Sequence, residues 1–141
     1  MNRISSTLCG LILFSAALLP AVAAQSNQTS PAQPVPAIDG GLGPCSLELT
    51  VTNADGKPAA AASVKVHIAY RFGGFHKLDL EAGANADGKV KFTGLPSQVR
   101  RPPLEFHASK DQLVGTAAFD PATECQAKRD ITLGKRNPSE Q

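Results

Sequence analysis

Residues 45–66 read CSLELTVTNADGKPAAAASVKV, and this stretch determines the expected fold. Apolar and polar side chains alternate over residues 45–52, which is typical of a β-strand that buries one face. The polar turn NADGK follows at residues 53–57, and alternation resumes at residues 63–66. The pattern therefore predicts two strands, separated by a turn, in a sheet that covers a hydrophobic core.

The pentapeptide NADGK returns at residues 85–89, again beside alternating residues. Asn at the first position and Gly at the fourth suit a type I turn that enters the left-handed region at the glycine. A calcium loop of the EF-hand type would need an acidic residue two positions before the Asn and a later glutamate, and neither copy has them. The repeat therefore predicts shared turn geometry rather than shared chemistry.

Alternation continues along the chain and predicts seven strands, at residues 45–52, 63–70, 76–82, 88–94, 103–110, 113–119 and 125–133. The last one places Arg129 on the same side as Ile131 and Leu133, so a register shift or bulge is expected there. Seven short strands separated by turn residues, with no helix, predict an all-β fold. The expected architecture is a seven-stranded antiparallel sandwich of the immunoglobulin-like or prealbumin-like kind.

The N-terminal residues 1–23 have the pattern of a secretory signal peptide. Arg3 precedes an apolar run, Leu8–Leu19, that is too short to span a bilayer as a stable helix. Small residues follow, and we expect cleavage after Ala23 or Ala24. The alternative is an uncleaved membrane anchor. We expect a secreted or periplasmic protein with no membrane span in the mature chain.

After the signal peptide, residues 24–44 are rich in proline and glycine and predict a flexible linker. Residues 45–133 form the expected β-sandwich domain, and residues 134–141 form a polar tail. Removal of Arg3 leaves 13 Lys and Arg against 12 Asp and Glu. This balance gives no electrostatic reason to expect a nucleic-acid partner.

Cys45 and Cys125 remain once Cys9 has left with the signal peptide. An even number of cysteines in an exported chain favours a disulfide, and the pair lacks the C-x-x-C spacing of redox or metal sites. We therefore expect a Cys45–Cys125 disulfide that joins the first strand to the last. Two unpaired buried thiols are the alternative.

Residues 47–66, 83–96 and 103–109 resemble the carboxypeptidase regulatory-like modules, which have a transthyretin-like (prealbumin-like) sandwich, here in a bacterial-type exported protein. The matching positions are Asp55, Gly56, Pro58, Ala62, Val64, Asp87, Gly88, Val90, Phe92, Gly94, Leu95 and Pro96. The resemblance implies a non-catalytic accessory module. The chain departs from the family pattern in its cysteine pair and in the absence of a following catalytic domain.

No catalytic residues are expected. The chain has no G-x-S-x-G elbow, and it ends in Pro-Ser-Glu-Gln, whereas the hydroxyisourate hydrolases of the transthyretin-like fold end in Tyr-Arg-Gly-Ser. The paired acids Asp79 and Glu81 follow strand alternation, so a solvated face explains them. The sequence therefore predicts a protein that is not an enzyme and needs no cofactor.

Three histidines, His67, His76 and His107, could supply ligands for zinc or copper from neighbouring strands. None of them stands two or four residues from another. We expect surface histidines and no metal site.

The sequence AYRFGGFHK, residues 69–77, predicts a hairpin tip with aromatic and cationic side chains. Arg71, Phe72, Phe75 and His76 form the candidate partner-binding loop. Alternatively, the two phenylalanines cover the end of the core. The run Arg100–Pro103 is interpreted as a solvated connection.

Together these features predict a non-catalytic exported interaction or envelope-associated module with a protein or glycan partner. The alternative is a carbohydrate-binding module. A periplasmic metal-binding protein is the third hypothesis.

Overall fold

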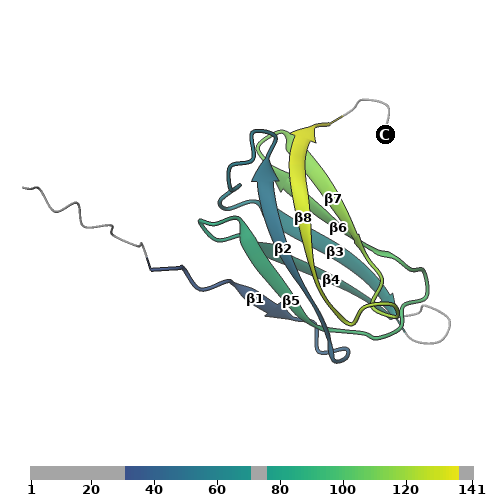
Figure 1. Ribbon diagram of the computed structural model, residues 1–141. Coiled ribbons are helices and arrows are strands. Elements are labelled where there is room, and N and C mark those ends of the chain that lie inside the picture. Colours follow the sequence, from purple (N-terminus) through teal and green to yellow (C-terminus); the bar gives the residue numbers. More distant parts are fainter. Residues whose placement is uncertain (1–30, 71–75, 137–141) are drawn as a thin grey trace, which may run out of the picture. The chain divides into compact units, whose positions relative to one another are not determined.

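The computed structural model describes residues 31–70 and 76–136, and all regular elements in these ranges are strands (Figure 1). The expected all-β class is confirmed. None of the described residues belongs to a helix of the length and apolarity needed to cross a membrane. The strands are β1 (Ala37–Asp39), β2 (Cys45–Asn53), β3 (Ser63–Tyr70), β4 (His76–Gly83), β5 (Lys89–Leu95), β6 (Leu104–Lys110), β7 (Leu113–Phe119) and β8 (Gln126–Lys135).

These strands form one mixed sheet in the order β1-β5-β2-β8-β7-β6-β3-β4. Strands β7 and β8 pair only through Leu113–Lys135 and Val114–Gly134, so the sheet divides there into two halves. Its edge strands approach each other, because a Cβ atom placed on Gly40 would lie 3.2 Å from Cδ1 of Leu80 on β4. The sheet is therefore nearly closed around its core.

The prediction of a seven-stranded antiparallel sandwich is wrong in two respects. Strand β1 adds an eighth strand parallel to β5, and the Lys91 N–H donates to the carbonyl of Pro36 at 2.9 Å. Strands β2 and β8 are also parallel and lie side by side (Figure 1). Three residues are too few to show alternation, and alternation within a strand carries no information about the direction of its neighbour. The predicted signal peptide, residues 1–23, lies outside the described residues.

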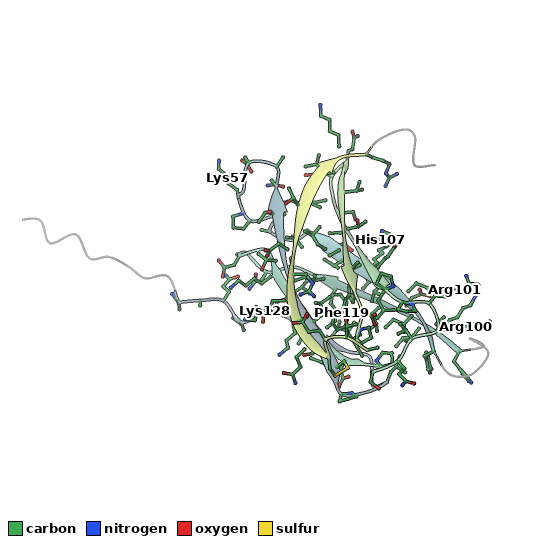
Figure 2. All side chains as sticks on the ribbon, turned by 45° about the vertical axis from the view of Figure 1, so that its right-hand side comes forward. Lys57, Arg100, Arg101, His107, Phe119 and Lys128 are labelled. Carbon is green, nitrogen blue, oxygen red and sulfur yellow. A yellow bond between two sulfur atoms is a disulfide. The ribbon has the colours of Figure 1, made fainter. Side chains whose placement is uncertain are left out.

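The core contains the inward positions that alternation predicted on β2, β3, β5 and β6. Three phenylalanine rings pack at its centre, with Phe106 edge-on to both Phe92 and Phe119 at centroid distances of 5.1 and 6.4 Å. The ring of Phe119 is buried in the core, and Figure 2 labels its position. The fully buried aliphatic side chains of the core include Leu47, Leu49, Val51, Val64, Ile68, Val90, Leu95, Ile131 and Leu133.

The register shift expected near Arg129 is absent, because β8 pairs with β2 without interruption from Gln126 to Leu133. Arg129 instead keeps its guanidinium at the surface, where Nη2 lies 2.7 Å from the carboxylate of Glu124. Because this ion pair keeps the charged group at the surface, β8 can carry an arginine on the same side as Ile131 and Leu133.

The two NADGK copies form the same turn. In each, the glycine N–H donates to the Asn carbonyl, at 2.9 Å from Gly56 to Asn53 and 3.0 Å from Gly88 to Asn85. Both glycines have positive φ, +81° and +72°. The prediction of shared turn geometry is confirmed. Their surroundings differ, because a Cβ on Gly88 would lie 2.2 Å from the Val51 carbonyl oxygen, whereas one on Gly56 meets nothing within 4 Å.

Cys45 and Cys125 form a disulfide between residues 80 positions apart. They stand at the start of the parallel ladder, since Ser46 pairs with Gln126 and the Ser46 N–H donates to the Cys125 carbonyl at 2.8 Å. The covalent link and the first ladder hydrogen bond therefore hold the same two chain segments.

Replacing both cysteines with alanine should lower the free energy of unfolding by about 2–5 kcal/mol, because the unfolded chain gains the entropy of an open loop. Urea denaturation of the variant and the oxidised wild type measures this loss. Iodoacetamide should label neither cysteine of the wild type before reduction. Stoichiometric labelling without a reductant would contradict the disulfide.

Gly88→Ala should destabilise the protein more than Gly56→Ala. Each change costs about 1–2 kcal/mol for a left-handed alanine, but only the alanine at position 88 also collides with backbone. Thermal denaturation of the two single variants provides the comparison, and each variant serves as the control for the other. Equal losses would show that the backbone beside Gly88 moves away at no cost.

Candidate anion-binding pocket

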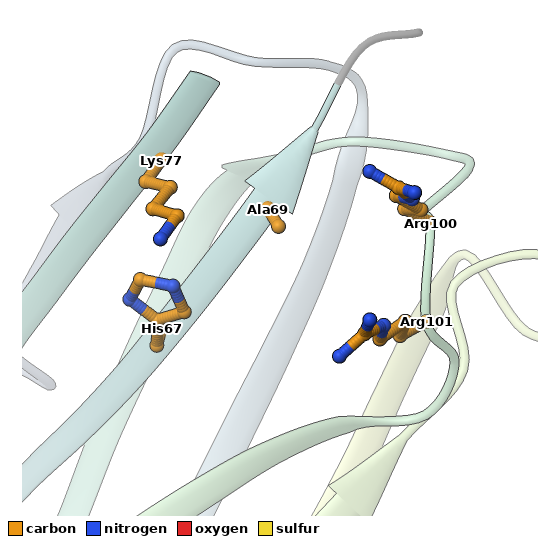
Figure 3. Close-up of a pocket in the computed structure, with 5 residues that line it drawn as sticks. All are labelled: His67, Ala69, Lys77, Arg100 and Arg101. Carbon is orange, nitrogen blue, oxygen red and sulfur yellow. The ribbon is translucent and has the colours of Figure 1, made fainter. Parts of the chain in front are cut away.

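Basic side chains surround a pocket on the outer face of β3 and β4. It has a volume of about 330 Å³ and is lined by His67, Ala69, Lys77, Arg100 and Arg101. Figure 3 shows His67 and Lys77 on one side of the pocket and the two arginines opposite them. Four of the five lining residues can therefore carry positive charge, which makes the pocket suited to an anion.

Strand alternation places the first three lining residues. Ile68 is fully buried, so its neighbours His67 and Ala69 point outward. Ala69 pairs with Lys77 across the β3–β4 ladder, and the small methyl group of Ala69 leaves space above the sheet. Strand alternation thus places the basic side chains of His67 and Lys77 at the side of the pocket and the small side chain of Ala69 at its base.

The connection between β5 and β6 supplies the two arginines. Leu95 and Leu104 are buried at its two ends, and Val99 packs against the core. These anchors hold the connection beside β3, and Arg100 and Arg101 stay exposed (Figure 2). The basic side of the pocket therefore depends on the packing of this connection against the core as well as on the two arginines.

The charges of the pocket are only partly compensated. His67 Nδ1 lies 2.5 Å from Oδ1 of Asp79, its cross-strand partner. Lys77 and Arg101 form no ion pair with any carboxylate of residues 31–70 and 76–136. Two cations that face one pocket, with no carboxylate partner among the described residues, favour the binding of a negative group.

Of the candidate partner-binding loop, the structure describes only His76. Arg71, Phe72 and Phe75 lie outside the described residues. His76 begins β4 and stacks on Tyr70, with ring centroids 5.6 Å apart. His107 Nε2 is 3.7 Å from Oε2 of Glu105. The described part of the chain contains no group of three or more His, Cys, Asp or Glu that could hold a metal ion.

The sequence alone does not predict this pocket, because its residues come from separate segments. The sequence presents His67 as a candidate metal ligand, and Arg100 and Arg101 as parts of a solvated connection. The two arginines beside two prolines were the available signal. Only the position of the connection over β3 brings them opposite Lys77.

No known protein family and no curated protein matches this sequence. Solved structures with a distant likeness include a catechol 1,2-dioxygenase from Pseudomonas arvilla C-1, with 16% identity, a TM-score of 0.47 and 75% of this chain covered. The Acinetobacter radioresistens catechol 1,2 dioxygenase shows 13% identity, a TM-score of 0.47 and 77% coverage of this chain. This chain spans 60% of the length of each. These values describe a likeness of fold alone.

This finding corrects the expectation that the chain is not an enzyme. A third neighbour, with 11% identity, a TM-score of 0.44, and coverage of 74% of this chain and 63% of its own, is a hydroxyquinol 1,2-dioxygenase from Pseudomonas putida DLL-E4. All three neighbours are enzymes, so the likeness of fold does not support the expectation of a non-catalytic protein. A shared fold at this distance assigns no reaction to this chain.

Beside the pocket, two interactions keep Glu81 ionised. The Ser63 hydroxyl donates to Oε1 at 2.6 Å, and Lys65 Nζ lies 3.3 Å from Oε2. The hydrogen bond from the Ser63 hydroxyl has the larger effect and the Lys65 ammonium group the smaller one. Together they hold the pKa of Glu81 below its ordinary value. Both interactions favour the charged carboxylate.

Ser63→Ala should therefore raise the pKa of Glu81 toward its ordinary value. Because the folded pKa is lowered, the stabilisation is present above the unfolded pKa and is lost as the pH falls through the folded pKa. Carbon-13 NMR titration of the carboxyl group measures the shift. Ser46→Ala, on the other half of the sheet, is the control, and an unchanged midpoint in Ser63→Ala would contradict the assignment.

Proposed function

We propose that this protein is an exported interaction module that holds an anionic group of its partner in the pocket formed by His67, Lys77, Arg100 and Arg101. The observation that supports the proposal most strongly is that Lys77 and Arg101 face the pocket without forming an ion pair in the described ranges. An anion that enters it would gain charge-assisted hydrogen bonds without first breaking a salt bridge at these two residues.

The geometry suits a carboxylate, sulfate or phosphate group. A guanidinium presents its N–H groups as a planar fork that matches two oxygens of such an anion, and an ammonium group adds a point charge. The four basic lining residues are exposed, so solvent and salt weaken these interactions, with a screening length of about 8 Å at physiological ionic strength. We therefore expect modest, salt-sensitive affinity for a single anion.

The export of the chain and its carboxypeptidase regulatory-like, transthyretin-like classification belong to the same proposal. The signal-like residues 1–23 and the matching residues 47–66 and 83–96 support them. An extracellular or envelope setting also agrees with the Cys45–Cys125 disulfide, because disulfides persist in oxidising compartments.

Arg101→Gln should weaken binding of inorganic sulfate about tenfold, because it removes a charge-assisted contact. Nitrogen-15 NMR titration of the purified protein follows the amides of His67, Lys77 and Arg101 as sulfate is added. Lys128→Gln is the matched control, since Lys128 is exposed on β8 and pairs with Glu48. Sulfate shifts that are absent at the pocket, or equal in both variants, would contradict the proposal.

A further inference from the structure

A second basic pocket lies on the same half of the sheet. It has a volume of about 390 Å³, and its lining includes Lys65, His107, Ser109, Thr116 and Arg136. Three of these residues can carry positive charge and two present hydroxyl groups. Lys65 and His107 lie beside the carboxylates of Glu81 and Glu105, so this pocket attracts an anion less strongly than the first, but it also offers hydrogen-bonding partners for neutral polar groups.

The two pockets are neighbours on one surface. Lys65 of the second and His67 of the first both point outward from β3, two residues or about 7 Å apart along the strand. Lys65 is also the cross-strand partner of His107, which in turn pairs with Thr116 on β7. One extended ligand on the outer face of the sheet can therefore occupy both pockets.

Strand addition is not available where β3 is paired on both sides. Strand β3 pairs with β4 and β6, and β6 pairs with β3 and β7. From Ser63 to Val66 the backbone of β3 is paired on both sides, so a partner that lies across this part of the surface must be recognised by side chains. The outward side chains of β3, β4 and β6 include no aromatic ring other than histidine, so charged and polar groups dominate recognition on these strands.

Carboxylates lie between the basic residues. Asp79 pairs with His67, Glu81 pairs with Lys65, and Glu105 lies beside His107. They repel a partner with dense, uniform negative charge, but they accept hydrogen bonds from hydroxyl groups. The pattern fits a polymer whose anionic groups are separated by hydroxyl-bearing units.

We infer that this surface binds an acidic polysaccharide, with one anionic group in each pocket. The inference rests on the proposed function and extends it to a partner class and to a second site. Joining two weak sites through one ligand raises the affinity, because the second contact becomes intramolecular. Affinity should therefore depend on the length of the sugar chain.

Hyaluronan provides the probe, because it carries one carboxylate per disaccharide repeat. The decasaccharide should bind the purified protein at least about tenfold more tightly than the disaccharide in calorimetry. Arg136→Gln should remove most of this gain, and Arg101→Gln should weaken both ligands. Lys128→Gln, on the other half of the sheet, should change neither.

The outcomes separate the two proposals. If Arg101→Gln weakens sulfate binding but chain length and Arg136→Gln have no effect, the second site is wrong and the proposed function stands. If Arg101→Gln leaves sulfate and both sugars unaffected, the proposed function fails as well. If polyphosphate or polyglutamate binds more tightly than the decasaccharide and shows the same dependence on Arg101 and Arg136, the partner class is wrong.

Discussion

The parallel pairing of β2 with β8 is the constraint on which the rest of the structure depends. These strands come from opposite ends of the described fold and pair over eight residue pairs, from Ser46–Gln126 to Asn53–Leu133. Cys45 and Cys125 join them covalently at the start of this ladder. Such long-range pairing carries a large entropic cost for an unfolded chain. The disulfide reduces that cost, and it keeps the two central strands in register beneath the core.

The functional surface follows from this central pair. Because β7 and β8 pair only at two positions, the sheet divides, and its other half presents β3, β4 and β6 with one face on the core and one face in solvent. The buried residues Val64, Val66 and Ile68 fix the direction of every outward residue on β3. Lys65, His67 and Ala69 therefore form a fixed outward row that lines two basic pockets.

Local balance of charge matters more here than the net charge. The chain has a formal charge of only +2, which gives no reason to expect an anionic partner. On this surface, however, basic residues gather at two pockets while acids pair with some of them and leave Lys77 and Arg101 without carboxylate partners in the described ranges. The distant likeness to dioxygenase structures concerns the path of the chain and is silent about these side chains.

The sequence by itself determined seven of the eight strands, the two turns and most of the core. Alternation is a local property, since each residue faces the core or solvent according to its place in its own strand, and Asn and Gly specify the turn within five residues. Strand direction, the eighth strand and the near closure of the sheet were decided only in the tertiary structure. They depend on hydrogen bonds between segments far apart in the chain, such as Lys91 with Pro36 and Ser46 with Cys125. The pocket also depends on the tertiary structure, because Arg101 lies across the pocket from Lys77 only once the core has positioned the β5–β6 connection.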